Sequence, residues 1–277
     1  MFRRYKPFFR AGMMSMLAYK GSLFGWFFIS ALEILCIYFL WLGVYKSSPG
    51  GIDSVINGFT LKEMLVYVTF SQIFNFVSFN SDTMYTISEE IKQGTIAMSF
   101  VKPISYRKRF AFTNLGSMFL GELILGLPCF TVAYALFVAF GYLVISSWWV
   151  FLLHVVLFLV SQLLAVLLCD CIDYIFGVLC FYTTAAWGMS QMKSVLLRFL
   201  SGALIPITFF PEVFKKLLNW SPFVGLTQNP VFILMMKIDL LSALKCVAIA
   251  LVWWVLLELF AMWLFSVASK KVTVQGG

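Results

Sequence analysis

Charge is scarce in this sequence, and histidine is almost absent. Of the 277 residues, 12% are charged, one is a histidine and 62% are hydrophobic, whereas soluble domains carry roughly 25% charged residues. Together with a mean hydropathy of +0.94, this composition indicates an integral membrane protein. The net charge of +8 has no polar domain that could present it to nucleic acid. We therefore expect the basic residues to lie beside anionic lipid, with no nucleic-acid partner.

Motifs for catalysis, nucleotide binding and metal binding are also missing. The sequence has no GxxxxGK[ST] loop for nucleotide phosphates, and its one histidine, His154, has no serine and acid arranged around it. Cys169 and Cys171 flank Asp170, but this spacing alone is a weak metal signal, and a bend packed with small residues is the alternative. We expect no enzyme, no cofactor bound by this chain and no metal site.

Long apolar runs predict six transmembrane helices in one membrane domain of residues 1–277, because a span needs about 20 apolar residues. The predicted spans are residues 22–44, 64–80 and 110–140, two within 148–192, and one at 243–268. The block 148–192 is too long for one helix, so we expect a hairpin that turns at Asp170 and Asp173. The third span is longer than a straight crossing requires, so we expect it to be tilted or to be kinked near Pro128.

Lysine and arginine are more frequent in the connections on the side of the two termini, which places both termini in the cytoplasm. Residues 1–20 predict an amphipathic helix at the membrane interface before the first span. A simple basic anchor is the alternative for that segment.

The connection before the last span, residues 195–223, is apolar but broken by Gly202, Pro206, Pro211 and Pro222. We expect two short helices that enter the outer leaflet and return. Irregular backbone at membrane depth must be covered by protein or must line a water-filled cavity. We therefore also expect the surface of a partner to cover this segment on the outer side of the spans.

Residues 88–110 are the one long polar stretch. Ser88 is predicted to cap a short cytoplasmic helix with Glu89 and Glu90 in its first turn, followed by Lys92 and stopped by Gly94. A loop whose only role is to place basic residues on the cytoplasmic side of the membrane would need no capped acidic helix. We therefore interpret residues 88–101 as a docking surface, with the plain basic loop as the alternative.

Three glutamates and the one histidine fall within the predicted spans, where burial of an ionisable group is costly and often functional. Glu33 and Glu122 are candidates for a substrate pathway or gate, as are Phe209 and Phe210 in the outer segment; Glu258 and His154 are weaker candidates. Each acid could instead be hydrogen-bonded to a neighbouring helix or wetted at a headgroup.

In order along the chain, these features resemble the membrane permease subunits of ABC exporters of the second type. The segment ISEEIKQGTIAMSFVKPISY resembles the family's connection between its second and third spans. The segment FLSGALIPITFFPEVFKKLLNWSPF resembles its re-entrant outer segment, and the terminal VQGG is also similar. The match is best with a bacterial branch of paired permeases.

The resemblance implies a connecting helix near residues 7–18 and a coupling helix, residues 88–101, seated in a groove of a separate ABC ATPase. It also implies a dimer of permeases in the bacterial cytoplasmic membrane, with ATP and Mg²⁺ bound by the ATPase dimer. The leading hypothesis is thus a half-transporter that exports an amphipathic drug, lipid or peptide. The alternative is an ion-driven secondary transporter or a channel, which would place paired ionisable residues at mid-depth.

Overall fold

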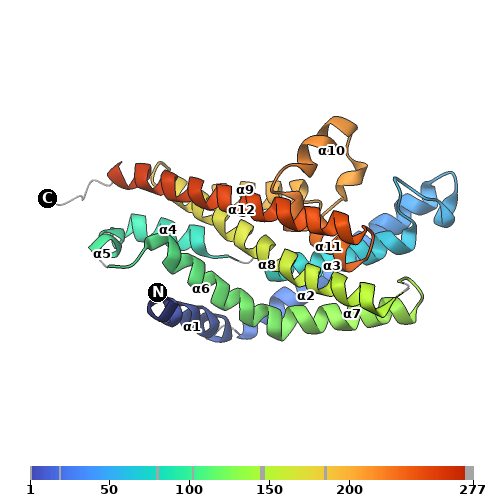
Figure 1. The fold of residues 1–277 in the computed structure, drawn as a ribbon, viewed down its shortest axis with the longest axis horizontal. Coiled ribbons are helices and arrows are strands. Elements are labelled where there is room, and N and C mark those ends of the chain that lie inside the picture. The colour runs from blue at the N-terminus through green and yellow to red at the C-terminus, as the bar shows by residue number, and fades with distance from the viewer. Residues whose placement is uncertain are drawn as a thin grey trace.

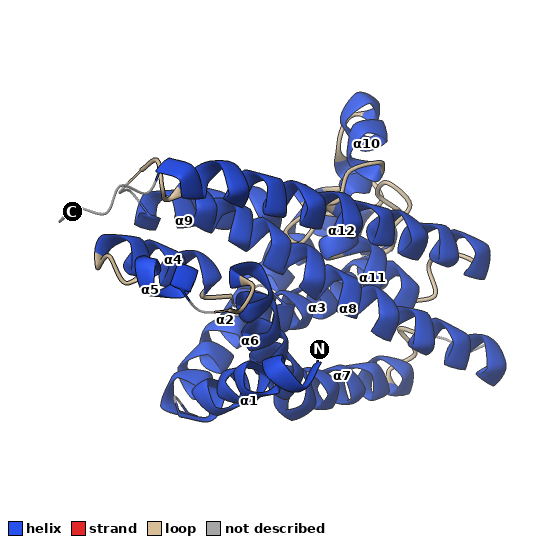
Figure 2. Ribbon diagram, turned by 60° about the vertical axis from the view of Figure 1, so that its left-hand side comes forward, coloured by secondary structure: helices blue, strands red, loops and turns tan. Residues whose placement is uncertain are grey.

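The computed structural model describes residues 2–18, 20–78, 81–101, 103–143, 147–183 and 186–271. Across these ranges the chain is helical, and its β pairing is limited to an isolated bridge between Ile56 and Phe59. The helices pack into one elongated bundle, as Figures 1 and 2 show. The predicted all-helical class is confirmed.

The helices in chain order are α1 (Phe2–Ala18), α2 (Lys20–Ser47), α3 (Leu61–Ser78), α4 (Thr83–Lys92), α5 (Ile96–Val101), α6 (Tyr106–Gly121), α7 (Leu127–Ala139), α8 (Trp148–Leu179), α9 (Ala186–Leu200), α10 (Glu212–Asn219), α11 (Gln228–Leu234) and α12 (Leu240–Ala268). A π-helical turn, Glu122–Gly126, joins α6 and α7 into one rod just before Pro128.

Within the residues that the structure describes, four stretches are long and apolar enough to cross a membrane: Phe27–Ser47, Tyr106–Ala139, Trp148–Leu179 and Leu240–Ala268. Helix α3 overlaps the predicted second span and has 18 residues. Helix α9 has 15 residues and overlaps only the end of the block 148–192, which was predicted to hold two spans. The outward faces of α2 and α12 carry exposed apolar side chains such as Phe28, Phe39 and Trp263. A multi-pass membrane protein presents such faces to lipid or to another subunit.

The predicted hairpin within residues 148–192 is wrong, because α8 continues through Asp170 and Asp173 without a break. No glycine or proline in this part of α8 ends the helix. Both carboxylates are paired instead, Asp170 with Arg107 of α6 and Asp173 with Lys193 of α9. The chain reverses after the C-terminal end of α8.

The outer segment begins later than the predicted residues 195–223, since α9 includes the first of them. Gly202 has a φ of +81° and turns the chain out of α9. Side chains satisfy the irregular backbone: the Tyr67 hydroxyl donates to the Gly202 carbonyl at 2.6 Å, and Gln228 Oε1 accepts from the Ile207 amide at 2.6 Å. These bonds supply the partners that backbone groups away from water require.

Helix α1 confirms that a separate helix precedes the first long one. It packs against α6 through two glycines, because a Cβ on Gly12 would overlap the Thr113 carbonyl and one on Gly116 would overlap the Phe9 carbonyl. The two backbones are therefore in direct contact. In Figure 1, α4, α5 and the C-terminal end of α12 share one end of the bundle, while the α2–α3 connection and the C-terminal end of α7 lie at the other.

Candidate functional site

Helices α4 and α5 form a short projection at one end of the bundle (Figure 1). The prediction that Ser88 caps this element is wrong: α4 starts at Thr83, and Ser88 lies inside it with 3% of its surface exposed. Met84, Ile87 and Ile91 recur at helical spacing on the face that packs against the bundle, which explains the earlier start.

The remaining residues of the predicted coupling segment divide between two faces. Glu90 turns inward and Glu89 outward, where Glu89 pairs with Lys92 at 3.6 Å. Both lie in the last turns of α4, so the predicted acidic first turn is also wrong. Gly94 has a φ of +70° and its N–H bonds to the Ile91 carbonyl at 3.1 Å, so its predicted role as the helix stop is confirmed.

Glu90 ties α4 to α6. Its carboxylate accepts from the Arg109 guanidinium at 2.6 Å and from the Tyr106 hydroxyl at 2.8 Å. The Arg109 guanidinium also lies 4.5 Å from the centroid of the Phe110 ring. The side chains of Glu90 and Arg109 are only about one fifth exposed. Because the two charges pair with each other, neither is readily accessible to another protein.

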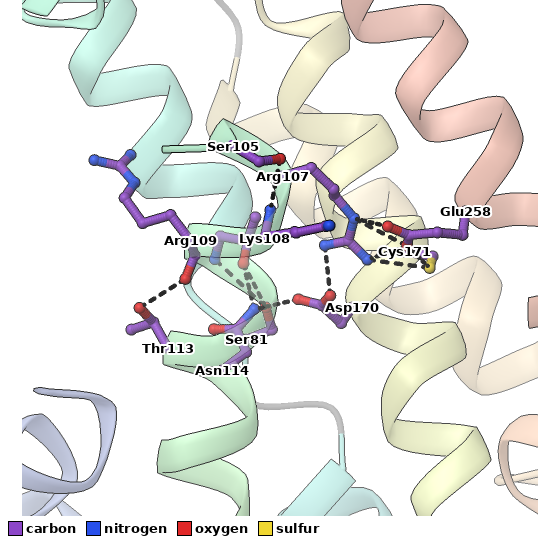
Figure 3. Close-up of polar contacts among 11 residues, drawn as sticks. Ser81, Ser105, Arg107, Lys108, Arg109, Thr113, Asn114, Asp170, Cys171 and Glu258 are labelled. Atoms are coloured by element: carbon purple, nitrogen blue, oxygen red, sulfur yellow. Dashed lines mark hydrogen bonds and ion pairs between the residues drawn. The ribbon is translucent and has the colours of Figure 1, made fainter. Parts of the chain in front are cut away.

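Arg107 occupies the centre of a buried charged group, shown in Figure 3. Its guanidinium lies 2.5 Å from Asp170 Oδ2 on α8 and 2.8 Å from Glu258 Oε2 on α12. The Arg107 side chain is 5% exposed and that of Asp170 is 2% exposed. One side chain of α6 thereby holds two further helices by charge-assisted hydrogen bonds.

Asn114, about two helical turns after Arg107 in α6, extends the group toward α4. Its amide donates to Asp170 Oδ1 at 2.5 Å, to Ser81 Oγ at 3.1 Å and to Thr83 Oγ1. Thr83 is the first residue of α4. Arg107, Asn114, Asp170 and Glu258 are called the charged cluster below, and they connect the start of α4 to α6, α8 and α12.

Apolar packing completes this joint. Ile87 of α4 lies over Gly177 of α8, where a Cβ would come within 2.6 Å of Ile87 Cδ1 and 3.3 Å of the Met84 backbone. Absence of a side chain at Gly177 lets the two helices meet closely. A displacement of α4 must therefore move α8 or open this contact.

The outer side of the projection is exposed and partly apolar. On α5, Met98 is 66% exposed and Val101 is 86% exposed, and on α4 the side chains of Glu89 and Lys92 are also exposed. Large apolar side chains together on a polar tip indicate an interaction surface. This surface, formed by Glu89, Lys92, Met98 and Val101, is called the projection tip below.

Among the predicted pathway residues, Glu122 lies apart from the other three. Glu33 pairs with Arg198 at 3.2 Å, while Glu122 accepts from Gln162 at 2.6 Å. Phe209 packs against Trp41, and Phe210 packs against Phe199. Glu33, Phe209 and Phe210 thus lie where α2, α9 and the segment after α9 meet, whereas Glu122 lies on the rod of α6 and α7, beside α8 (Figure 1).

Sequence reasoning missed the charged cluster. It treated Arg107 as a basic loop residue and Asp170 as a turn residue, although both lie within helices. A usable signal was present: an acid within an apolar helix requires a basic or amide partner, and the helix that begins at Tyr106 carries Arg107 and Asn114. The sequence separation of 63 positions between Arg107 and Asp170 hid the pairing.

The structure thus defines an all-helical membrane protein with a projection joined to several long helices. A model of the ABC-2 family transporter proteins matches residues 23–276. The chain therefore belongs to this family and is a permease component of an ABC transporter, a class that works with an ABC ATPase component. A search of curated proteins gives no match to the chain.

Proposed function

We propose that this permease is half of the membrane pathway of an ATP-driven exporter, paired with a second permease subunit in the bacterial cytoplasmic membrane. Both termini face the cytoplasm, at the end of the bundle that carries α4 and α5. The substrate is amphipathic: a drug, a lipid or a peptide. ATP and Mg²⁺ bind to a separate ATPase dimer, which supplies the free energy for the change of state.

The observation that carries this proposal is that one side of the projection is exposed while the other side is fixed to the bundle. Its tip exposes Met98 and Val101, whereas its inner side is fixed to α6 by Glu90 and to α8 by Ile87. An element that is exposed on one side and firmly joined on the other suits the transfer of force from a partner. We assign the ATPase contact to the projection tip.

Within this proposal the residues of the coupling segment have different tasks. Glu89 and Lys92 face the ATPase, Ser88 and Glu90 hold α4 to the bundle, and Gly94 makes the reversal between α4 and α5. The charged cluster then passes movement of α4 to α8 and α12.

The test is the combined substitution Met98→Asp and Val101→Asp, with Val55→Asp in the α2–α3 connection as the control. Val55 is 65% exposed at the opposite end of the bundle. We expect the amount of ATPase copurified per permease to fall at least about tenfold in the double variant, since a buried apolar anchor at an interface contributes roughly 1–2 kcal/mol or more. Unchanged copurification in the double variant would refute the assignment of the tip.

A further inference from the structure

Glu122 occupies a site with an unusual construction. Glu122 is the first residue of the π-helical turn Glu122–Gly126. This turn lies inside the rod Tyr106–Ala139, which is long and apolar enough to cross a membrane. Its carboxyl group lies over Gly126, where a Cβ would come within 2.7 Å of both carboxylate oxygens. The missing side chain at Gly126 provides the room for the carboxyl group. Single π turns of this kind are frequent at functional sites.

The neighbouring helix supplies one polar partner. Gln162 of α8 donates from Nε2 to Glu122 Oε2 at 2.6 Å, and the Gln162 residue is 4% exposed. The other oxygen of each side chain, Glu122 Oε1 and Gln162 Oε1, is buried without a hydrogen-bond partner. Two acceptor oxygens on adjacent side chains therefore lack donors, and such orphaned groups call for an explanation.

A comparison with the other glutamates sharpens this observation. In the described part of the chain, each of the other six has a lysine or arginine within 4.0 Å: Glu33, Glu63, Glu89, Glu90, Glu212 and Glu258. Glu122 has an amide instead. What the site lacks is a positive charge that also donates hydrogen bonds.

We propose that Glu122 and Gln162 bind the ammonium group of a cationic amphiphile, which would be the substrate class of the exporter proposed above. The N–H groups of the ammonium donate to Glu122 Oε1 and Gln162 Oε1 in charge-assisted hydrogen bonds. The same segment exposes Phe119, Leu123 and Ile124 on its outer side, where the apolar tail of the ligand lies. Because the two oxygens are covered in this structure, the ligand enters as the side chains rotate toward that exposed face.

The experiment measures ligand-dependent thermal stabilisation of the purified full-length permease in nanodiscs. Three probes share one tail: dodecylammonium, dodecyltrimethylammonium, which has the charge but no N–H donors, and 1-dodecanol, which has no charge. We expect dodecylammonium to bind the wild type at least about tenfold more tightly than either of the others, since each hydrogen bond to a charged group contributes on that scale.

Two variants and a control decide the assignment. Glu122→Gln removes the charge, and Gly126→Ala pushes the carboxyl group out of its place. Each variant should bind the three probes with about equal affinity. Glu33→Gln is the matched control, because that membrane glutamate already pairs with Arg198. If Glu122→Gln does not fold, the Gly126→Ala result decides.

Equal binding of the three probes to the wild type would overturn the proposal, as would an unchanged preference in Glu122→Gln or Gly126→Ala. This assay contains no ATPase. A lost ammonium preference beside normal ATPase copurification therefore contradicts the site alone, whereas normal preference without any ATPase association contradicts the proposed function alone.

Discussion

The charged cluster and the π turn of Glu122 both place carboxylates between apolar helices, but the surroundings of these carboxylates differ. In the charged cluster, Asp170 and Glu258 share the guanidinium of Arg107, and Asn114 donates a further hydrogen bond to Asp170. In the π-turn region, Glu122 has only an amide partner and keeps one orphaned oxygen. The same chemical group is thus fully paired in one place and half-paired in the other.

The difference teaches how a membrane helix can use an acid in two ways. A paired network fixes the relative positions of the helices that contribute to it, because each member is costly to leave alone. A half-paired acid adds little to the fold but remains available to a ligand. We therefore expect substitutions in the charged cluster to alter stability and substitutions at Glu122 to alter binding.

The largest effect is expected from Arg107→Leu. This change leaves Asp170 and Glu258 without their basic partner in a buried setting, and removal of one member of such a pair typically costs about 3–5 kcal/mol. We expect the permease to unfold at a much lower temperature, or to be recovered in low yield, when measured by thermal denaturation in detergent.

A triple variant tests whether pairing is the cause. With Arg107→Leu, Asp170→Leu and Glu258→Leu combined, no buried charge of the cluster remains uncompensated, and stability should return most of the way to the wild type. If the triple variant is as unstable as Arg107→Leu alone, the defect lies in lost packing of the long arginine side chain and not in unpaired carboxylates.

A smaller loss of stability is expected when alanine replaces Gly177 or Gly126, the two glycines whose missing side chains leave room for Ile87 and Glu122. The size of the loss should differ between the two variants. Gly177→Ala places a methyl group against Ile87 and the Met84 backbone, and overpacking of this kind costs about 1–3 kcal/mol. Gly126→Ala meets only the movable end of the Glu122 side chain, so its cost in stability should be lower. The measurement is the midpoint of thermal unfolding for both variants.

Gly188→Ala serves as the control for this pair, because nothing lies within 4 Å of a Cβ at that position of α9. A Gly126→Ala variant that is less stable than Gly177→Ala would mean that the Glu122 carboxyl group supports the fold, and would remove the contrast between the two regions.

Local properties explain which parts of the fold could be predicted. The long helices near residues 22–44, 110–140 and 243–268 follow from apolar length alone. Gly94 was predictable because a positive φ at a helix end is a property of a single residue. The hairpin prediction failed since the choice between a turn and a buried pair at Asp170 depended on Arg107, which is distant in the sequence.

A short helical element was predicted near residues 88–101, but its orientation was not. Residues 88–101 do lie in the projection, yet the sequence could not show which glutamate faces inward, because that choice depends on Arg109 and Tyr106 of α6. The orphaned oxygen of Glu122 was likewise beyond sequence reasoning, since it depends on the register of α8 beside the π turn.

The smallest effect is expected from the two adjacent glutamates of α4, and it tests the division into paired and available charges at neighbouring positions. Glu90→Gln weakens the partly buried contact with Arg109 and should lower the free energy of unfolding by about 1–2 kcal/mol, since hydrogen bonds between charged groups contribute on that scale. Glu89→Gln affects only an exposed pair with Lys92 and should change the free energy of unfolding by less than about 0.5 kcal/mol.

ATPase copurification should respond in the opposite order, because Glu89 lies on the projection tip and Glu90 does not. Reduced ATPase binding in a fully stable Glu90→Gln variant, beside normal binding in Glu89→Gln, would show that α4 turns its other face to the ATPase.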